Sequence, residues 1–241
     1  MLGDGELTDP ERAVERAAAV GGLVDLGTGD ARRDHPGRAA RWGSGRTVRA
    51  ELLAELLTGR RRPDGGQARA VWLRGARVSG VLDLDAARLE CPLLLDRCFL
   101  ERSVGLRDAR AQAIRLPGCH VPGIAADQLR TEGSVELNDG FTATAVISLT
   151  GARIGGRLDL SSAVVAGSGG VAVDADGLVV EQNMPCAGLT VAGELRLSGA
   201  RRRPAGPGRC PAGKSRRVRA WCRRPVGGAE HVLPSRLYRP G

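Results

Sequence analysis

A short phrase of apolar and polar positions recurs about every eleven residues between Val71 and Ala200. Each copy reads apolar, any residue, Leu, two further residues, Ala or another small residue, any residue, apolar. The first two copies are residues 71–78 and 82–89. The apolar-x-Leu part alternates with a period of two, so we expect each copy to contribute one short strand with both apolar residues facing inward. A fixed period of this kind predicts a repeat architecture.

The length of the phrase determines how a coil can close. Opposing walls must stand about 10 Å apart to hold a side-chain core, and eleven residues are too few to enclose one. Two copies, about 22 residues, can close one coil. Ten regular copies and two weak ones, centred on Ala126 and Met184, then give about six coils stacked at roughly 4.8 Å. The sequence therefore predicts an all-β repeat domain, a parallel β-helix.

A leucine-rich repeat is the main alternative, because L-x-L-x-x-[A/C]-x-L resembles its consensus. Leucine-rich repeats need about 20–29 residues, with a variable return segment between equal strands. Here the phrase recurs within each half of that length, so the return segment is itself a strand. This favours the β-helix over a horseshoe.

The first 60 residues lack the phrase and predict a small α-helical cap. Residues 8–11 (Thr-Asp-Pro-Glu) form a capping box with proline in the first turn, so a helix should run from about residue 9 to residue 20 and end at Gly21 and Gly22. A second helix should begin at Thr47 and stop at Gly59, with one apolar face formed by Val48, Leu52, Leu53, Leu56 and Leu57. Gly80, Gly133, Gly156 and Gly193 precede several predicted strands and suit turns.

The pattern stops inside a copy near residue 201. The block Gly199-Ala200-Arg201 continues with Arg202 in an apolar slot, and the period does not return. Residues 202–241 hold six of the thirteen prolines and predict a disordered Arg/Pro/Gly-rich basic tail. The tail is either a native arm that contacts nucleic acid or an anionic membrane, or the product of a truncated or frameshifted gene. Either leaves an open strand edge on the last coil, which predicts self-association there.

The chain therefore divides into an N-terminal helical cap region (1–60), a linker (61–70), the β-helix (71–201) and the basic tail (202–241). Charge follows the same division. Residues 201–241 hold twelve basic residues and one Glu, a net charge of +11, whereas the other 200 residues carry −2. The N-terminus lacks a basic n-region and no apolar run reaches about 18 residues, so we expect neither a signal peptide nor a membrane span. We expect a cytoplasmic protein.

The candidate chemical groups form no recognisable catalytic or metal-binding motif. The histidines, His35, His120 and His231, lie far apart in sequence, and His120 should point to solvent. The six cysteines contain no CxxC pair, and Cys98 and Cys119 occupy the small slot of the phrase, as small buried hydrophobes do. We therefore expect no catalytic, cofactor-binding or metal-binding residue, and no cofactor.

Three polar segments invite a functional interpretation. Asp83 and Asp159 each lie between two inward-facing apolar residues, so they should point outward; they could form a carboxylate ladder, although a solvated face is the simpler interpretation. Residues 167–170 (Gly-Ser-Gly-Gly) form an insertion without the spacing of a phosphate-binding loop. Residues 174–177 (Asp-Ala-Asp-Gly) resemble part of a calcium loop but lack its later glutamate.

Two blocks of the form G-A-R-[IV]-x-G-x-L-D-L, at residues 75–84 and 151–160, carry a family resemblance. The phrase resembles a loosened form of the pentapeptide repeat, whose units build a right-handed quadrilateral β-helix. More closely, the chain is similar to a group of high-GC bacterial proteins that carry these blocks and are often called membrane-associated oxidoreductases. The resemblance covers about residues 20–201 and implies a right-handed β-helix. The longer period here argues against strictly quadrilateral coils.

These observations predict a non-catalytic β-helical scaffold whose outer faces bind a protein partner. An oxidoreductase-type enzyme with a cofactor at the helical cap or the 167–170 insertion is one alternative, and the resemblance implies it. Nucleic-acid binding through the basic tail is the other. The DNA mimicry known among pentapeptide-repeat relatives relies on a strongly acidic surface, which a body charge of −2 does not favour.

Overall fold

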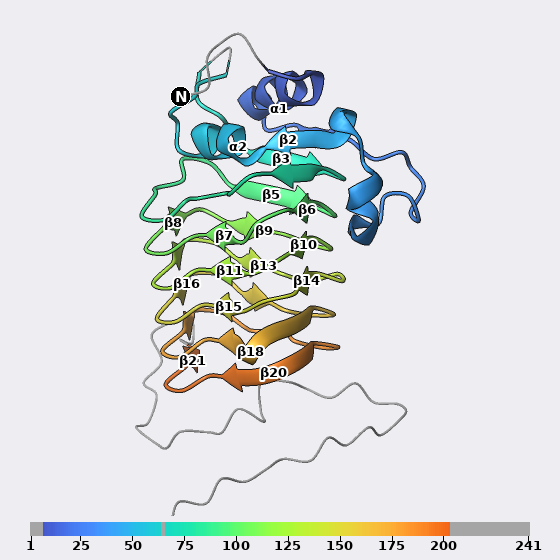
Figure 1. Cartoon of the computed structure of the whole chain (residues 1–241). Helices are drawn as coiled ribbons and strands as arrows, with labels where there is room; N and C mark the ends of the chain where they lie inside the picture. The colour runs from blue at the N-terminus through green and yellow to red at the C-terminus, as the bar shows by residue number, and fades with distance from the viewer. Residues whose placement is uncertain (1–6, 64–65, 203–241) are drawn as a thin grey trace, which may run out of the picture.

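The protein is a parallel β-helix that two short helices close at its N-terminal end (Figure 1). The computed structural model describes residues 7–63 and 66–202. About six coils of roughly 22 residues stack along one axis, so the predicted fold is confirmed. The predicted tail, residues 202–241, lies outside the described residues except for Arg202. That residue forms the short strand β21 (Arg201–Arg202), in register with β19 (Val179–Val180).

The strands form three parallel sheets. Sheet A contains β1 (Leu23–Asp25), β3 (Val71–Arg74), β5 (Leu93–Asp96), β9 (Ile114–Arg115), β13 (Val135–Glu136) and β17 (Leu158–Asp159). Sheet C contains β8 (Arg110–Ala111), β12 (Arg130–Thr131), β16 (Arg153–Ile154), β19 and β21. Sheet B is continuous through β18 (Val164–Asp174), which turns a corner and joins two arms.

The first arm of sheet B contains β2 (Thr47–Arg49), β4 (Arg77–Ser79), β6 (Phe99–Leu100), β10 (His120–Val121) and β14 (Thr142–Ala143). The second arm contains β7 (Val104–Gly105), β11 (Ile124–Ala125) and β15 (Ile147–Ser148). β20 (Thr190–Arg196) pairs with β18 along both arms. Each coil therefore visits sheet A, the first arm, the second arm and sheet C in turn, and has four sides despite the eleven-residue period.

Each copy of the phrase contributes two short strands, not the one we predicted. In the first copy Val71 and Leu73 face inward from sheet A, and Ala76 and Val78 face inward after the corner; all four side chains are buried. The residues after the small slot also alternate, so they form a strand of their own on the next wall. The core is a stack of such layers, chiefly Leu, Val, Ile and Ala, with Cys98 and Cys119 in small slots as predicted.

At two of the four corners the chain turns through a residue in the left-handed backbone conformation, and these residues stack in a column. The residue two positions after the central Leu has a positive φ in every copy, including non-glycine residues such as Ala86, Asp108 and Gln128. This column shows that the late copies are centred on Ala175 and Cys186, not on Val173 and Met184 as the sequence indicated. Of the glycines we expected at turns, Gly80 and Gly193 have a positive φ, whereas Gly133 and Gly156 do not. A Cβ at Gly133 would come within 2.9 Å of the carbonyl oxygen of Gln112, and one at Gly156 within 2.5 Å of Ser134 Oγ.

The left-handed column predicts opposite effects for two neighbouring substitutions. Gly151→Ala should lower the free energy of unfolding by about 1–2 kcal/mol, because Gly151 has φ 66° and a Cβ there would contact the side chain of Gln128. Gln128→Gly should raise it by about 1 kcal/mol, because Gln128 adopts φ 57° at a steric cost that glycine avoids. Urea unfolding of both variants measures the difference. Two changes of the same sign would contradict this account.

Two α-helices, two short 3-10 helices (Pro36–Arg41 and Ser44–Arg46) and two strands form the N-terminal cap. α1 (Asp9–Val20) begins with the predicted capping box at Thr8 and ends at Gly21 in the left-handed conformation. α2 is shorter than predicted and spans Ala50–Leu57. Residues 47–49, which we expected in that helix, form β2 because they pair in register with β4 of the first coil. β1 pairs with β3 in the same way. The cap therefore adds one strand each to sheets A and B, although its sequence lacks the repeated phrase.

A buried ion pair joins α1 to β2. The carboxylate of Glu11, which is 1% exposed, accepts bonds from the Arg49 guanidinium at 2.7 Å and from the Arg49 backbone N–H at 3.0 Å. It also accepts the Thr8 backbone N–H at 3.0 Å. Burial alone raises the pKa of Glu11, but the bonds from Arg49 and Thr8 outweigh it and lower the pKa to about 2.

Replacing Glu11 by glutamine should therefore destabilise the cap. A charged partner that loses its counter-ion in a buried site costs about 3 kcal/mol, so Glu11→Gln should lower the free energy of unfolding by roughly that amount at neutral pH. The pKa of Glu11 falls from 4.5 to about 2 on folding. The stability that ionised Glu11 contributes to the folded state is thus fully present above the unfolded pKa and is lost as the pH falls through the folded pKa.

Guanidinium unfolding as a function of pH measures this effect. The difference between wild type and Glu11→Gln should narrow as the pH drops from about 5 to about 2. Asp9→Asn is the matched control, since the side chain of Asp9 is 94% exposed. A pH-independent difference would show that Glu11 contributes through packing alone.

Candidate functional site

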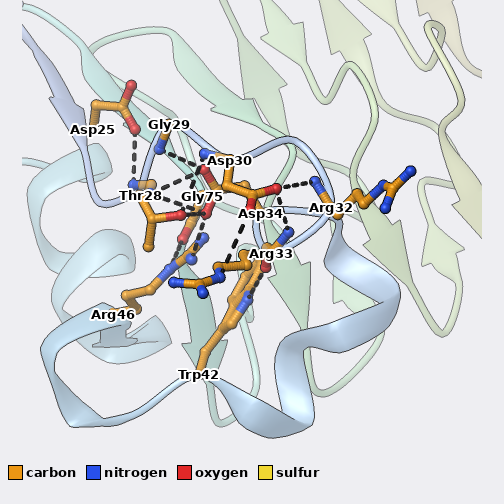
Figure 2. Close-up of polar contacts among 11 residues, drawn as sticks. Asp25, Thr28, Gly29, Asp30, Arg32, Arg33, Asp34, Trp42, Arg46 and Gly75 are labelled. Carbon is orange, nitrogen blue, oxygen red and sulfur yellow. Dashed lines mark hydrogen bonds and ion pairs between the residues drawn. The ribbon is translucent and has the colours of Figure 1, made fainter.

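A loop between β1 and β2 is fastened to the first coil by Arg46 (Figure 2). The Arg46 Nε donates to the carbonyl oxygen of Gly75 at 2.8 Å, and its Nη1 donates to Asp34 at 2.7 Å. The guanidinium lies 3.8 Å above the ring of Trp42, a cation–π contact. A Cβ at Gly75 would come within 2.9 Å of Arg46 Nη2, which explains glycine at this corner. Arg46 therefore links the loop to the β-helix.

Asp34 organises the other end of this loop. Its carboxylate accepts the backbone N–H groups of Thr28 and Gly29 at 2.9 Å each, and the hydroxyl of Thr28 at 3.1 Å. Burial raises the pKa of Asp34, but the Thr28 bonds and Arg46 outweigh it, so the pKa lies below its usual value. The indole of Trp42 donates to the carbonyl oxygen of Arg33 at 3.0 Å. These contacts satisfy the carboxylate within the loop, so the cluster is a structural clamp.

The clamp brings together two histidines that we expected to be unrelated. The ring centroids of His35, in the loop, and His120, in β10, lie 5.2 Å apart in an edge-to-face arrangement. His35 Nδ1 accepts the backbone N–H of Gly37 at 3.1 Å. His120 sits on the outer face of the first arm, as predicted, but it is half-buried because the loop covers it. Burial and the neighbouring His35 both lower the pKa of His120.

This pair predicts that acid loosens the loop. A histidine whose folded pKa is depressed binds fewer protons in the folded state than in the unfolded state. The stability of the loop is therefore highest at high pH and falls as the pH drops through the unfolded pKa of 6.5. The protection factors of residues 26–46, which already account for slower intrinsic exchange at lower pH, should therefore fall between pH 7.5 and pH 5.5. His120→Gln should remove this loss of protection, whereas His231→Gln, outside the described residues, should retain it. Equal behaviour of both variants would count against the pair.

The buried thiols offer no activated nucleophile. Cys91, Cys98 and Cys119 are free and buried. The Cys119 thiol lies 3.3 Å from the carbonyl oxygen of Leu95 and accepts the backbone N–H of Cys98 at 3.4 Å. Burial raises the pKa of Cys119 and raises that of Cys91 to about 11. A reactive cysteine needs the opposite shift and access to solvent.

The two predicted outward carboxylates lie on different walls. Asp83 pairs with Gly105 on the second arm of sheet B, whereas Asp159 belongs to sheet A. The two carboxylates therefore form no ladder with each other, because alternate copies of the phrase occupy opposite sides of the coil. Asp159 is also not solvated: it is 7% exposed, accepts the Ser161 backbone N–H at 3.0 Å and bonds the Asn138 amide at 3.2 Å.

The remaining polar segments belong to the frame of the β-helix. Residues 167 and 170 lie inside β18, where the register shifts between Ala166 and Val171 as the strand turns the corner. Asp174 accepts the Asp176 backbone N–H at 3.2 Å, and Asp176 accepts that of Ser198 at 2.6 Å. These carboxylates stabilise turns between coils. In residues 7–63 and 66–202, no group of three or more His, Cys, Asp or Glu side chains is arranged to hold a metal ion.

Sheet C carries a column of four exposed arginines. Arg88 pairs with Arg110, Arg110 with Arg130, and Arg130 with Arg153, so the four side chains occupy one outward position on successive coils. In-register strands stand about 4.8 Å apart, which places like charges directly opposite one another and is destabilising. We call this row the arginine column. Among the described residues, no carboxylate forms an ion pair with any of its members.

Arginines on the other walls differ in this respect. On sheet A, Arg74 bonds Asp96 of the next coil at 2.7 Å. On the second arm of sheet B, Arg107 lies 2.9 Å from Asp85 and 3.7 Å from Asp127, the acids on the coils before and after it. Charge alternates along those columns and is neutralised within the chain. Among the described residues, the arginine column is the row that stacks one sign over four coils.

A groove runs beside the arginine column. Its lining includes three of the four arginines and, two residues further along the chain in each coil, Glu90, Gln112 and Glu132. Gln112 Nε2 donates to the carbonyl oxygen of Glu90 at 3.2 Å, and the Glu90 carboxylate accepts the amide of Gln67 at 3.0 Å. Cationic and carboxylate or amide groups thus face the same open space. We call this the sheet C groove.

The sequence contained the signal for this groove, although we predicted no site residue from it. Arginine commonly precedes the closing apolar residue of the phrase, yet a linear view assigns these arginines to one general solvated face. Only the four-sided coil shows that Arg88, Arg110, Arg130 and Arg153 share a wall while arginines of the intervening copies lie elsewhere.

No family model, curated protein or solved structure matches this chain in the comparisons made. The resemblance to pentapeptide-repeat proteins and to the oxidoreductase-labelled group therefore stays a prediction. Among the helices of residues 7–63 and 66–202, none has the length and apolarity needed to cross a membrane.

Proposed function

We propose that this chain is a non-catalytic β-helical scaffold that binds a macromolecular partner along sheet C. The arginine column is the observation that carries the proposal. Four exposed cations in one row, which form no ion pair with a carboxylate of the described residues, cost stability in the free chain, and an anionic partner would relieve that cost. The protein partner expected from the sequence stays a prediction, as do self-association through the last coil and binding through the basic tail.

The rigidity of the wall supports a binding role. The inward residues under the column, such as Leu89, Ala111 and Ile154, are buried in the continuous core. Their strands are short and hydrogen-bonded on both sides, so the arginine backbones are fixed before a partner arrives. Binding to a surface that is already ordered costs less entropy than binding to a mobile loop. Such a surface suits a scaffold better than a catalytic centre, which needs converging groups.

Site-specific crosslinking tests the proposal. A photoreactive residue at Gln112, in the groove, should capture a partner in irradiated cells, and the same residue at Thr144, exposed on the first arm of sheet B, should not. Adding Arg110→Gln and Arg130→Gln should reduce the yield at Gln112 severalfold, because two of four charges are lost. Equal capture at both positions would contradict the proposal. So would a cofactor that co-purifies with the chain and supports a reaction dependent on it.

A further inference from the structure

We propose that the sheet C groove binds a single strand of nucleic acid, with its phosphates on the arginine column and its bases toward Glu90, Gln112 and Glu132. This inference rests on the proposed use of sheet C and names the chemistry of the partner. It differs from binding through the basic tail, because every residue involved belongs to the β-helix.

The column matches a phosphodiester backbone in chemistry and in shape. Arginine presents a planar fork of donors that fits phosphate, and it remains charged at every relevant pH. The four members stand about 4.8 Å apart in a straight row, so the cations form a line about 14 Å long. A nucleic-acid strand carries one anion on every residue and can follow such a line. An acidic protein surface would need its carboxylates aligned in the same way.

The neighbouring column of Glu90, Gln112 and Glu132 confines the backbone and accepts the bases. The carboxylates of Glu90 and Glu132 repel phosphate, so the strand is held on the arginine side. A carboxylate accepts from the amino group of a base, as in glutamate contacts to cytosine, and the Gln112 amide both donates and accepts. The groove lining has no aromatic side chain, so bases do not stack on it. We therefore expect weak sequence preference and strong dependence on salt.

A single strand fits this wall better than a duplex. Readers of duplex DNA insert a helix or a two-stranded ribbon into the major groove. Sheet C is a wall of strands only two residues long, and the column on it is one side chain wide. One row of cations can meet one row of phosphates, and the second strand of a duplex would find no counterpart.

Salt-dependent binding of the full chain to labelled dC12 and rC12 tests the inference, because cytosine carries the amino group that a carboxylate accepts. Each phosphate contact with a single strand adds about 0.7 to the slope of log affinity against log salt. The variant R88Q/R110Q/R130Q/R153Q should therefore lower the slope by about 2.8, whatever the tail contributes. Between 50 and 200 mM salt, this equals about a 50-fold smaller loss of affinity than in wild type. E90Q/E132Q should raise the affinity, because two like charges leave the groove.

The matched control removes the same charge elsewhere. R38Q/R41Q/R97Q/R102Q changes four exposed arginines away from sheet C and should leave the slope within about one contact of wild type. Thermal melting confirms that both variants fold. An unchanged slope in the column variant, with binding retained, would assign the nucleic acid to the tail and overturn the inference.

A second arm separates nucleic acid from other anions. A polyglutamate peptide of equal charge should bind at least tenfold more weakly than dC12, because its carboxylates lack the phosphate geometry and the bases. Equal affinity, with equal sensitivity to the column variant, would overturn the nucleic-acid assignment but leave the scaffold proposal intact. Loss of crosslinking at Gln112 in cells, together with retained oligonucleotide binding, would overturn the scaffold proposal instead.

Discussion

In-register parallel pairing between coils is the constraint on which the rest of the structure depends. Each residue lies directly over its equivalent about 22 positions earlier, so side chains stack in columns both inside and outside the wall. Inside, this stacking demands a repeated small or branched apolar residue at each position. Outside, residues of one type at the same position of successive coils form a row of side chains along the molecule. Neither the core nor the surface can vary one coil at a time without affecting its neighbours.

The same constraint governs electrostatics. On sheet A and on the second arm of sheet B an outward column alternates acid and base, as for Asp85, Arg107 and Asp127, and the charges cancel within the chain. A column of one sign is therefore the exception, and it stores unfavourable energy that a ligand could release. In the cap, a buried charge is likewise neutralised by a partner within the chain. There Glu11 is held ionised by Arg49 and two backbone N–H groups, and helix, strand and first coil become one unit.

Much of the architecture could be predicted from the sequence, because the period and the inward alternation depend on local residue type. The capping box of α1 and the small slots of Cys98 and Cys119 belong to the same category. The start of α2 could not be predicted: residues 47–49 have a helical apolar pattern, but pairing with β4 offers them more hydrogen bonds. The His35–His120 contact and the arginine column depend on which wall each copy occupies, and a linear period leaves that undetermined.

The strands of the cap have a consequence for how the chain is made. β1 and β2 precede the repeat and already present the edges on which β3 and β4 pair, so the first coil has a template when it leaves the ribosome. Each later coil pairs with the one just completed. Winding can therefore proceed in the order of synthesis, without waiting for distant residues, and the loop closed at each step is only about one coil long. The N-terminal cap thus provides the first pairing edges of the β-helix as well as covering its end.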